Sequence, residues 1–126
     1  MKDEYFQELK VKFNLTDTET SEPSLESLNS ISKKAFYAIH YSDLSIHCKD
    51  AAETELEWDT IFRRLISEDL PGCCYERSEV LFQLLDHLRY EVYRLEVRCV
   101  SKKKVSPFRH EHMALAVRLD DQEWYF

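Results

Sequence analysis

Residues 71–100 read PGCCYERSEVLFQLLDHLRYEVYRLEVRCV, and the spacing of the apolar residues changes within them. From 80 to 88, apolar residues recur every three or four positions. This spacing predicts a helix that starts at the two cysteines, just after Pro71 and Gly72. From 92 to 100, apolar and charged residues alternate, which predicts a strand. The chain therefore passes here from helices into a sheet.

The sequence before this stretch has the apolar spacing of helices. We expect helices at 3–10 and at 25–40, the second capped at its start by Ser24. A further helical stripe begins at Trp58 and must end near the Pro-Gly pair, because proline disfavours the helical conformation in the residue before it. Residues 14–24 are polar and are expected to form a loop.

Two further strands are expected after this stretch. Residues 112–119 alternate between apolar and polar or small side chains, and 123–126 begin a third strand after a short acidic turn. The polar segment 101–111 is expected to form a loop. This order predicts an α+β protein with an antiparallel sheet. We divide it into a helical N-terminal domain at 1–88 and an incomplete β domain at 89–126.

The composition excludes several classes of partner. The 126 residues carry 24 acidic and 17 basic side chains, a formal net charge of −7, which argues against nucleic-acid and anionic-membrane partners. No stretch reaches the roughly 18 consecutive apolar residues of a membrane span. The charged N-terminus lacks the apolar region of a signal peptide. We therefore expect a cytoplasmic protein whose four cysteines are reduced.

The candidate nucleophile is one of two adjacent cysteines, Cys73 and Cys74, at the start of a predicted helix. The first turn of a helix presents unpaired N–H groups and the positive end of the helix dipole, and both favour a thiolate. A thiolate is the nucleophilic form required for covalent catalysis. Gly72 would let the backbone turn sharply before it without a Cβ clash. The alternative is that both cysteines are small residues packed beneath the helix start.

A nucleophilic cysteine needs a base, and His112 is the histidine with the best-defined place. It begins a predicted strand, which would hold the imidazole in a fixed direction. His110 lies in the preceding loop and is less constrained. A zinc site is not expected, because the C-x₂₋₄-C and H-x₃₋₅-H spacings of structural zinc ligands are missing. A phosphate-binding loop is excluded because the chain has one glycine.

Taken together, these residues resemble the arylamine N-acetyltransferase family. Leu70–Glu76, with the sequence LPGCCYE, matches the family's Arg-Gly-Gly-x-Cys motif and the aromatic-Glu pair that follows it. Residues 40–46 take the place of its Pro-Phe-Glu-Asn-Leu-Asp-Ile segment, and His112–Val117 resembles its catalytic histidine strand. The resemblance extends over almost the whole chain.

The resemblance implies a cysteine-protease-like core, in which a helical bundle is followed by the first strands of an antiparallel β-barrel-like sheet. It implies Cys74 as the nucleophile and His112 as its base. Acetyl-CoA would acylate the cysteine, and a small-molecule arylamine or hydrazine would then accept the acetyl group, without a metal. Family members are longer, so the resemblance implies the N-terminal part of such an enzyme.

Three departures from the family pattern leave other interpretations open. Leu70 and Pro71 stand where the motif has arginine and glycine, and the sequence stops before the strand that carries the family's triad aspartate. Other carboxylates that could orient the histidine are Asp43, Glu76, Asp120 and Asp121. The chain could instead be a non-catalytic binding module of the family, or a different cysteine–histidine enzyme such as a thiol hydrolase. An exposed sheet edge would offer a surface for self-association.

Overall fold

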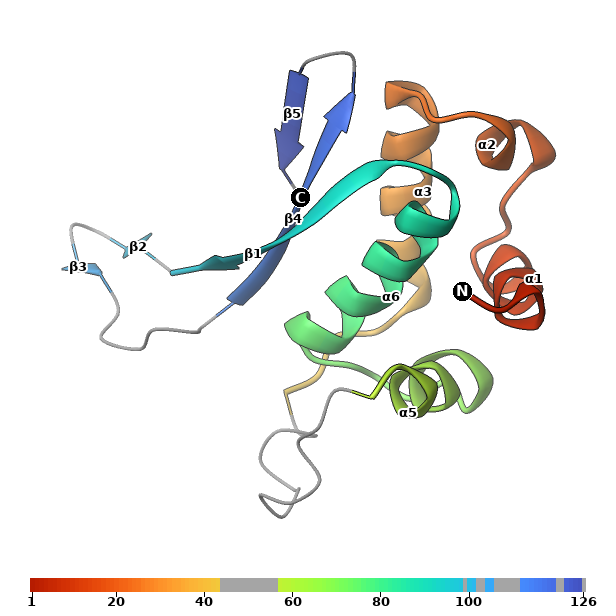
Figure 1. Cartoon of the computed structure of the whole chain (residues 1–126). Coiled ribbons are helices and arrows are strands. Elements are labelled where there is room, and N and C mark those ends of the chain that lie inside the picture. Colours follow the sequence, from red (N-terminus) through yellow and green to blue (C-terminus); the bar gives the residue numbers. More distant parts are fainter. Residues whose placement is uncertain (44–56, 99, 102–103, 106–111, 120–121, 126) are drawn as a thin grey trace.

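The computed structural model describes residues 1–43, 57–98, 100–101, 104–105, 112–119 and 122–125. Helices come first along the chain and strands follow, which confirms the predicted α+β order (Figure 1). The helices are α1 (Asp3–Lys12), α2 (Asp17–Ser21), α3 (Leu25–Ala38), α5 (Trp58–Phe62), the π-helix η2 (Arg63–Ser67) and α6 (Cys74–His87). The strands are β1 (Glu91–Val97), β2 (Val100–Ser101), β3 (Lys104–Val105), β4 (His112–Leu119) and β5 (Gln122–Tyr125).

The starts of two helices follow from the residues that cap them. Ser24 caps α3 as predicted, because its side chain accepts a hydrogen bond from the backbone N–H of Ser27 at 3.1 Å. The loop predicted at 14–24 is wrong in part, since α2 forms within it. Thr16 and Glu19 make a reciprocal capping box there. This short-range signal starts a helical turn even where the sequence has no apolar stripe.

β4 is the central strand of a three-stranded antiparallel sheet with the order β1-β4-β5. His112 lies opposite Val97 of β1, and Ala116 lies opposite Tyr125 of β5. β2 and β3 form a separate antiparallel pair, so the loop predicted at 101–111 is wrong where β2 and β3 fall within it. Strands of two residues are too short to show an apolar alternation.

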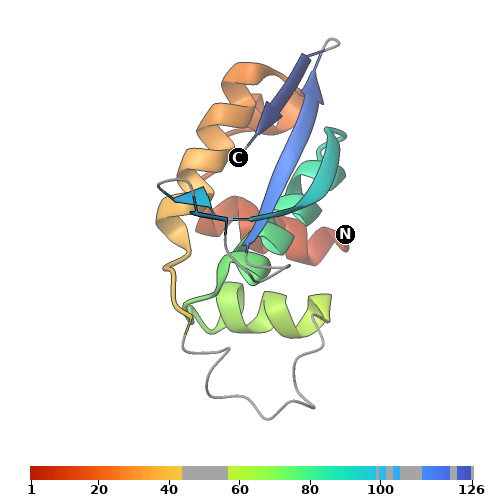
Figure 2. The same cartoon turned by 90° about the vertical axis from the view of Figure 1, so that its left-hand side faces the viewer.

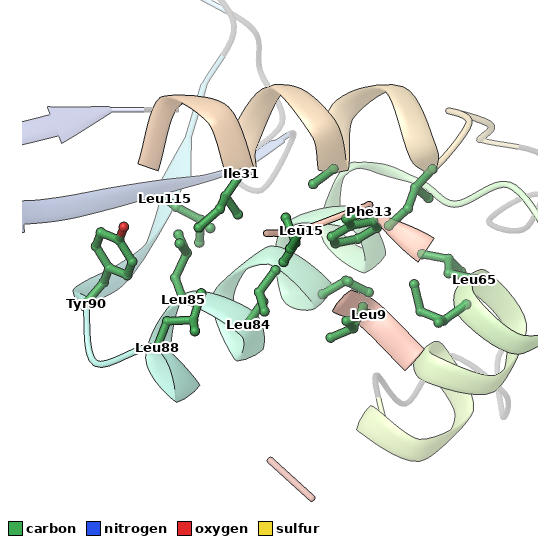
Figure 3. Packing of buried hydrophobic residues seen from close by; sticks show 14 of the residues in the cluster. Leu9, Phe13, Leu15, Ile31, Leu65, Leu84, Leu85, Leu88, Tyr90 and Leu115 are labelled. Atoms are coloured by element: carbon green, nitrogen blue, oxygen red, sulfur yellow. The ribbon is translucent and has the colours of Figure 1, made fainter. Parts of the chain in front are cut away.

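α6 supplies the centre of the hydrophobic core. Its Leu84 and Leu85 are fully buried, in one cluster with Ile31 of α3, Leu9 of α1 and Leu115 of β4 (Figure 3). Burying one leucine side chain stabilises a fold by about 1.5–3 kcal/mol. The apolar stripe predicted for this helix is therefore confirmed, and it holds helices and sheet together.

β1 and β4 pack on one side of α6. Figure 1 shows α6 between the strands and α1, and Figure 2, which faces the sheet, shows β4 in front of α6 with α3 beside it. In both views the beginning of α6 lies near the beginning of β4. The packing therefore brings the helix start that carries the two cysteines close to the strand end that carries His112.

Glu19 joins α2 to α3. Its carboxylate accepts hydrogen bonds from the Lys34 ammonium at 2.7 Å, from the Ser30 hydroxyl and from Thr16. Burial alone would raise the pKa of Glu19, but these hydrogen bonds lower it to about 2. A carboxyl whose pKa is lowered in the folded state stabilises the fold at pH values above the pKa that it has in the unfolded chain. For glutamate that unfolded pKa is about 4.3. The stabilisation by Glu19 is lost as the pH falls from the unfolded pKa through the folded pKa.

We expect Glu19→Gln to lower the free energy of unfolding by about 2 kcal/mol at neutral pH, because charged hydrogen bonds are lost. The difference from wild type should shrink as the pH falls from about 5 to about 2.5, where wild-type Glu19 becomes protonated. Chemical denaturation at several pH values measures both effects. Glu22→Gln, at an exposed carboxylate, is the control and should show neither. A loss that stays constant down to low pH would contradict this account.

Candidate active site

A pocket of about 380 Å³ lies where α3, α6 and the start of β4 meet. Cys74 and His112, the two residues predicted to carry the chemistry, both line it. The remaining lining residues are mainly apolar: Ser32, Ala35, Phe36, Ile39, Tyr41, Arg77, Ser78, Leu81, Met113 and Leu115. The fold therefore brings a thiol and an imidazole, far apart in the sequence, to the wall of one cavity.

The two adjacent cysteines occupy different environments. Cys73 is the N-cap of α6 and is only 4% exposed. Burial raises the pKa of its thiol. Cys74 is the first residue of α6, is half-buried and lines the pocket. Local sequence could not separate these two thiols, whereas the structure gives only Cys74 access to the cavity.

A buried carboxylate fixes the helix start. Glu76 is 3% exposed, and it accepts a hydrogen bond from the backbone N–H of Cys73 at 3.0 Å. It also forms an ion pair with Arg64 of η2. Burial alone would raise the pKa of Glu76, but the Cys73 N–H and the Arg64 charge hold it below its ordinary value. The carboxylate of Glu76 thus binds the Arg64 guanidinium and the backbone N–H of Cys73.

The segment before the helix is fixed from two sides. The Gly72 N–H donates to the carbonyl of His40 at 2.9 Å, and its carbonyl accepts from the N–H of Ser42 at 3.0 Å. A Cβ on Gly72 would lie 2.6 Å from Cδ2 of Leu65. The predicted absence of a Cβ clash is therefore the reason for this glycine, and Gly72 does not have a positive φ. Close packing against Leu65, rather than a special backbone conformation, requires it.

A side-chain hydrogen bond holds β4 to α6 beside the site. The Ser78 hydroxyl, one helical turn after Cys74, donates to the backbone carbonyl of Met113 at 3.1 Å. Met113 follows His112, the exposed first residue of β4. This bond therefore helps to set the position of β4, which carries His112, relative to α6, which carries Cys74.

The sequence interpretation left the residue that orients His112 open. No Asp or Glu is found among the described residues that line the pocket. Glu76 is held by Arg64 and the helix cap, and Asp120 and Asp121 lie outside the described part of the chain. His110 and Cys99 lie outside it as well.

Sequence reasoning missed Arg77. Its guanidinium lies 5.0 Å from the ring centroid of Phe36 and 6.0 Å from that of Tyr41. Its Nη2 donates to the Phe36 carbonyl at 3.0 Å. One feature of the sequence could have indicated it. Arg77 follows Cys74 by three residues, and residues three apart in a helix lie on the same face.

Comparison with known proteins defines the class. The sequence profile of a family described as N-acetyltransferase matches residues 24–126. The chain belongs to this family, the arylamine N-acetyltransferases. Proansamycin X synthase of Amycolatopsis mediterranei (strain S699) is 32% identical over 101 residues, which are 79% of this chain and 39% of that protein.

Solved structures show the same fold. The arylamine N-acetyltransferase from Mycobacterium abscessus matches with a TM-score of 0.82 and 20% identity, over 95% of this chain and 40% of that one. An arylamine N-acetyltransferase from Bacillus cereus, described as having a unique Cys-His-Glu catalytic triad, matches with a TM-score of 0.77 and 15% identity. That match covers 99% of this chain and 48% of the other. The chain thus spans less than half the length of these relatives.

The described residues lack two kinds of feature. None of their helices is both long and apolar enough to cross a membrane. No three of their His, Cys, Asp and Glu side chains come together as a metal-binding group.

We expect Glu76→Gln to lower the free energy of unfolding by about 3 kcal/mol at neutral pH, because it leaves the Arg64 charge without its partner. Denaturant titration measures the loss. The loss should diminish as the pH falls through the lowered pKa of Glu76, where the wild-type pair also disappears. Glu79→Gln is the matched control on the same helix, since its partner Arg94 is more exposed, and should cost about 1 kcal/mol or less.

A double-mutant cycle tests the pair directly. Arg64→Met combined with Glu76→Gln should cost less than the sum of the two single changes, because neither residue is then left as an unpaired charge. Additive losses would show that the two side chains do not interact.

Proposed function

We propose that this chain takes part in acetyl transfer from acetyl-CoA to an arylamine or hydrazine, with Cys74 as the nucleophile and His112 as its base. The observation that carries the proposal is that both side chains line one pocket. Membership of the arylamine N-acetyltransferase family supports the reaction class. The Cys-His pair named for the Bacillus cereus relative supports the pairing of residue types.

In the first half-reaction, Sγ of Cys74 attacks the carbonyl carbon of the acetyl thioester. The bond between that carbon and the CoA sulfur breaks, so that the acetyl group is transferred to the enzyme. His112 takes the proton of the Cys74 thiol and gives a proton to the departing CoA thiolate. The products are acetyl-Cys74 and free CoA.

In the second half-reaction, the acceptor nitrogen attacks the same carbonyl carbon. The carbon–sulfur bond to Cys74 breaks and the amide forms. His112 accepts a proton from the attacking amine and returns one to the Cys74 thiolate. The enzyme is regenerated, and the two half-reactions together form a ping-pong cycle.

A non-catalytic binding module of the same family is the second candidate. One observation favours it: no carboxylate is among the described residues that line the pocket. The two candidates differ in whether Cys74 forms an acetyl adduct. Self-association through a sheet edge, a cytoplasmic location and the division at residue 88 stay predictions.

We expect iodoacetamide to alkylate Cys74 faster than Cys73, Cys48 or Cys99 in the folded protein at neutral pH. Cys73 is buried and its pKa is raised by burial, whereas Cys74 borders the pocket. Peptide mass spectrometry after short exposure gives the four rates. Equal labelling of all four thiols under native conditions would count against Cys74 as the nucleophile.

We expect acetyl-CoA to add one acetyl group to the chain, seen by intact-mass spectrometry. Cys74→Ala should abolish the adduct, and Cys73→Ala, the neighbouring control, should retain it. His112→Gln should slow its formation by about 100-fold or more, the usual contribution of a general base. If wild type forms no adduct while Cys74→Ala binds arylamines unchanged, the binding module is the correct interpretation.

A further inference from the structure

Cys73 is a nucleophilic group that the proposed acetyl transfer does not use. It directly precedes Cys74 in the sequence, and neither residue is part of a disulfide. Cys74 borders the cavity, whereas Cys73 is the N-cap of α6 and is buried. The start of α6 therefore carries two thiols, one that is reached from the cavity and one in the adjoining residue.

The backbone at the start of α6 allows the two side chains to point to the same side. Consecutive side chains in a strand point to opposite faces. Cys73 has extended backbone angles, with φ -76° and ψ 176°, but Cys74 already lies in the first turn of the helix. This change of conformation removes the alternation, so that both sulfurs can reach one atom placed between them.

A direct bond between the two sulfurs is disfavoured by their position in the chain. Consecutive Cα atoms are about 3.8 Å apart, whereas the Cα atoms of ordinary disulfides are about 4.4–6.8 Å apart. A single atom that bonds to both sulfurs lengthens the bridge between them and so reduces this misfit. The pair is therefore better suited to hold a sulfur-binding atom than to form a disulfide.

The backbone on both sides of the pair is already fixed. Gly72 forms backbone hydrogen bonds with His40 and Ser42, and the Glu76 carboxylate accepts a hydrogen bond from the N–H of Cys73. To reach an atom at Cys74, the side chain of Cys73 has only to turn about its Cα–Cβ bond. Two ligands on one rigid segment lose less conformational freedom on binding than two ligands on separate loops.

The number of thiols and the shape of the cavity select the class of ligand. Thiolates prefer soft, polarisable centres. Among the residues that the structure describes, no three metal-binding side chains come together, so a centre that requires three protein ligands is unsuited. Trivalent arsenic with one organic substituent requires two thiols, because its third bond is to carbon. The mainly apolar cavity of about 380 Å³ has room for that organic group.

We propose that Cys73 and Cys74 form a dithiol site for trivalent arsenicals with one organic substituent, of the form R–As(OH)₂. Sγ of Cys74 bonds to arsenic first, an As–O bond breaks, and the hydroxide leaves as water with the thiol proton. Sγ of Cys73 then displaces the second hydroxide in the same way. Arsenic stays trivalent, so the reaction needs no oxidant or reductant. The site requires the two thiols and does not depend on acetyl transfer.

The test treats the whole chain at neutral pH with phenylarsine oxide, whose hydrate has the form R–As(OH)₂. Intact-mass spectrometry detects the adduct, which gains one phenylarsenic group and loses two hydrogens. Excess glutathione, a monothiol, should leave the adduct on wild type, because the second protein thiol acts at a high effective concentration. The dithiol 2,3-dimercaptopropanol should remove it.

Three variants show whether the two adjacent thiols act together. Cys73→Ser should release the arsenical at a glutathione concentration about 100-fold lower than wild type, and Cys74→Ser should do the same. Serine is a favoured N-cap residue, so Cys73→Ser should fold, which circular dichroism checks. Cys48→Ala removes a thiol elsewhere in the sequence; it is the control and should match wild type.

Four results would overturn the inference. They are the absence of an adduct on wild type, its removal from wild type by glutathione, its loss in Cys48→Ala, and a folded Cys73→Ser that holds it as tightly as wild type. A Cys73–Cys74 disulfide, seen as the loss of two hydrogens in the untreated protein, would overturn it as well. The absence of an acetyl adduct on Cys74 is a separate result, which concerns the proposed acetyl transfer alone.

Discussion

The carboxylate of Glu76 is the constraint on which the site depends. It ties the backbone N–H of Cys73 to the first turn of α6 and joins that turn to Arg64 of η2. Taking both charges out of water is costly, and their mutual attraction and hydrogen bonds offset that cost only in this geometry. The start of α6 therefore has one position relative to η2, and Cys74, the next residue after the cap, is placed with it.

The remaining parts of the site are positioned by residues further along α6. Ser78 attaches the start of β4, Arg77 meets the rings of Phe36 and Tyr41, and the apolar stripe further along the helix joins the core. One helix thus presents the thiol, the cation and the strand anchor along its first turns. The thiol of Cys74 and the guanidinium of Arg77 therefore lie in the wall of the same cavity.

The elements with a regular spacing of apolar residues could be predicted from the sequence. A helix without such spacing, and contacts made only in the folded chain, could not. The stripe of α6, the alternation at 112–119 and the Ser24 cap depend on spacing that the sequence displays directly. α2 was missed because its signal is a capping pair, Thr16 and Glu19, without an apolar face. The pairing of Cys74 with His112 came from resemblance to a family. Arg77 was missed because its role depends on which rings the fold brings beside it, and spacing along one helix does not contain that information.

The side chain of Leu65 packs directly against the backbone of Gly72. The glycine is the single one in the chain, and the space that its side chain would need is filled by the leucine. A side chain at position 72 would have to displace the end of the Leu65 side chain, so we expect the two positions to vary together among related sequences. Such a compensating exchange would keep the loop that precedes Cys74 in place while changing both residues.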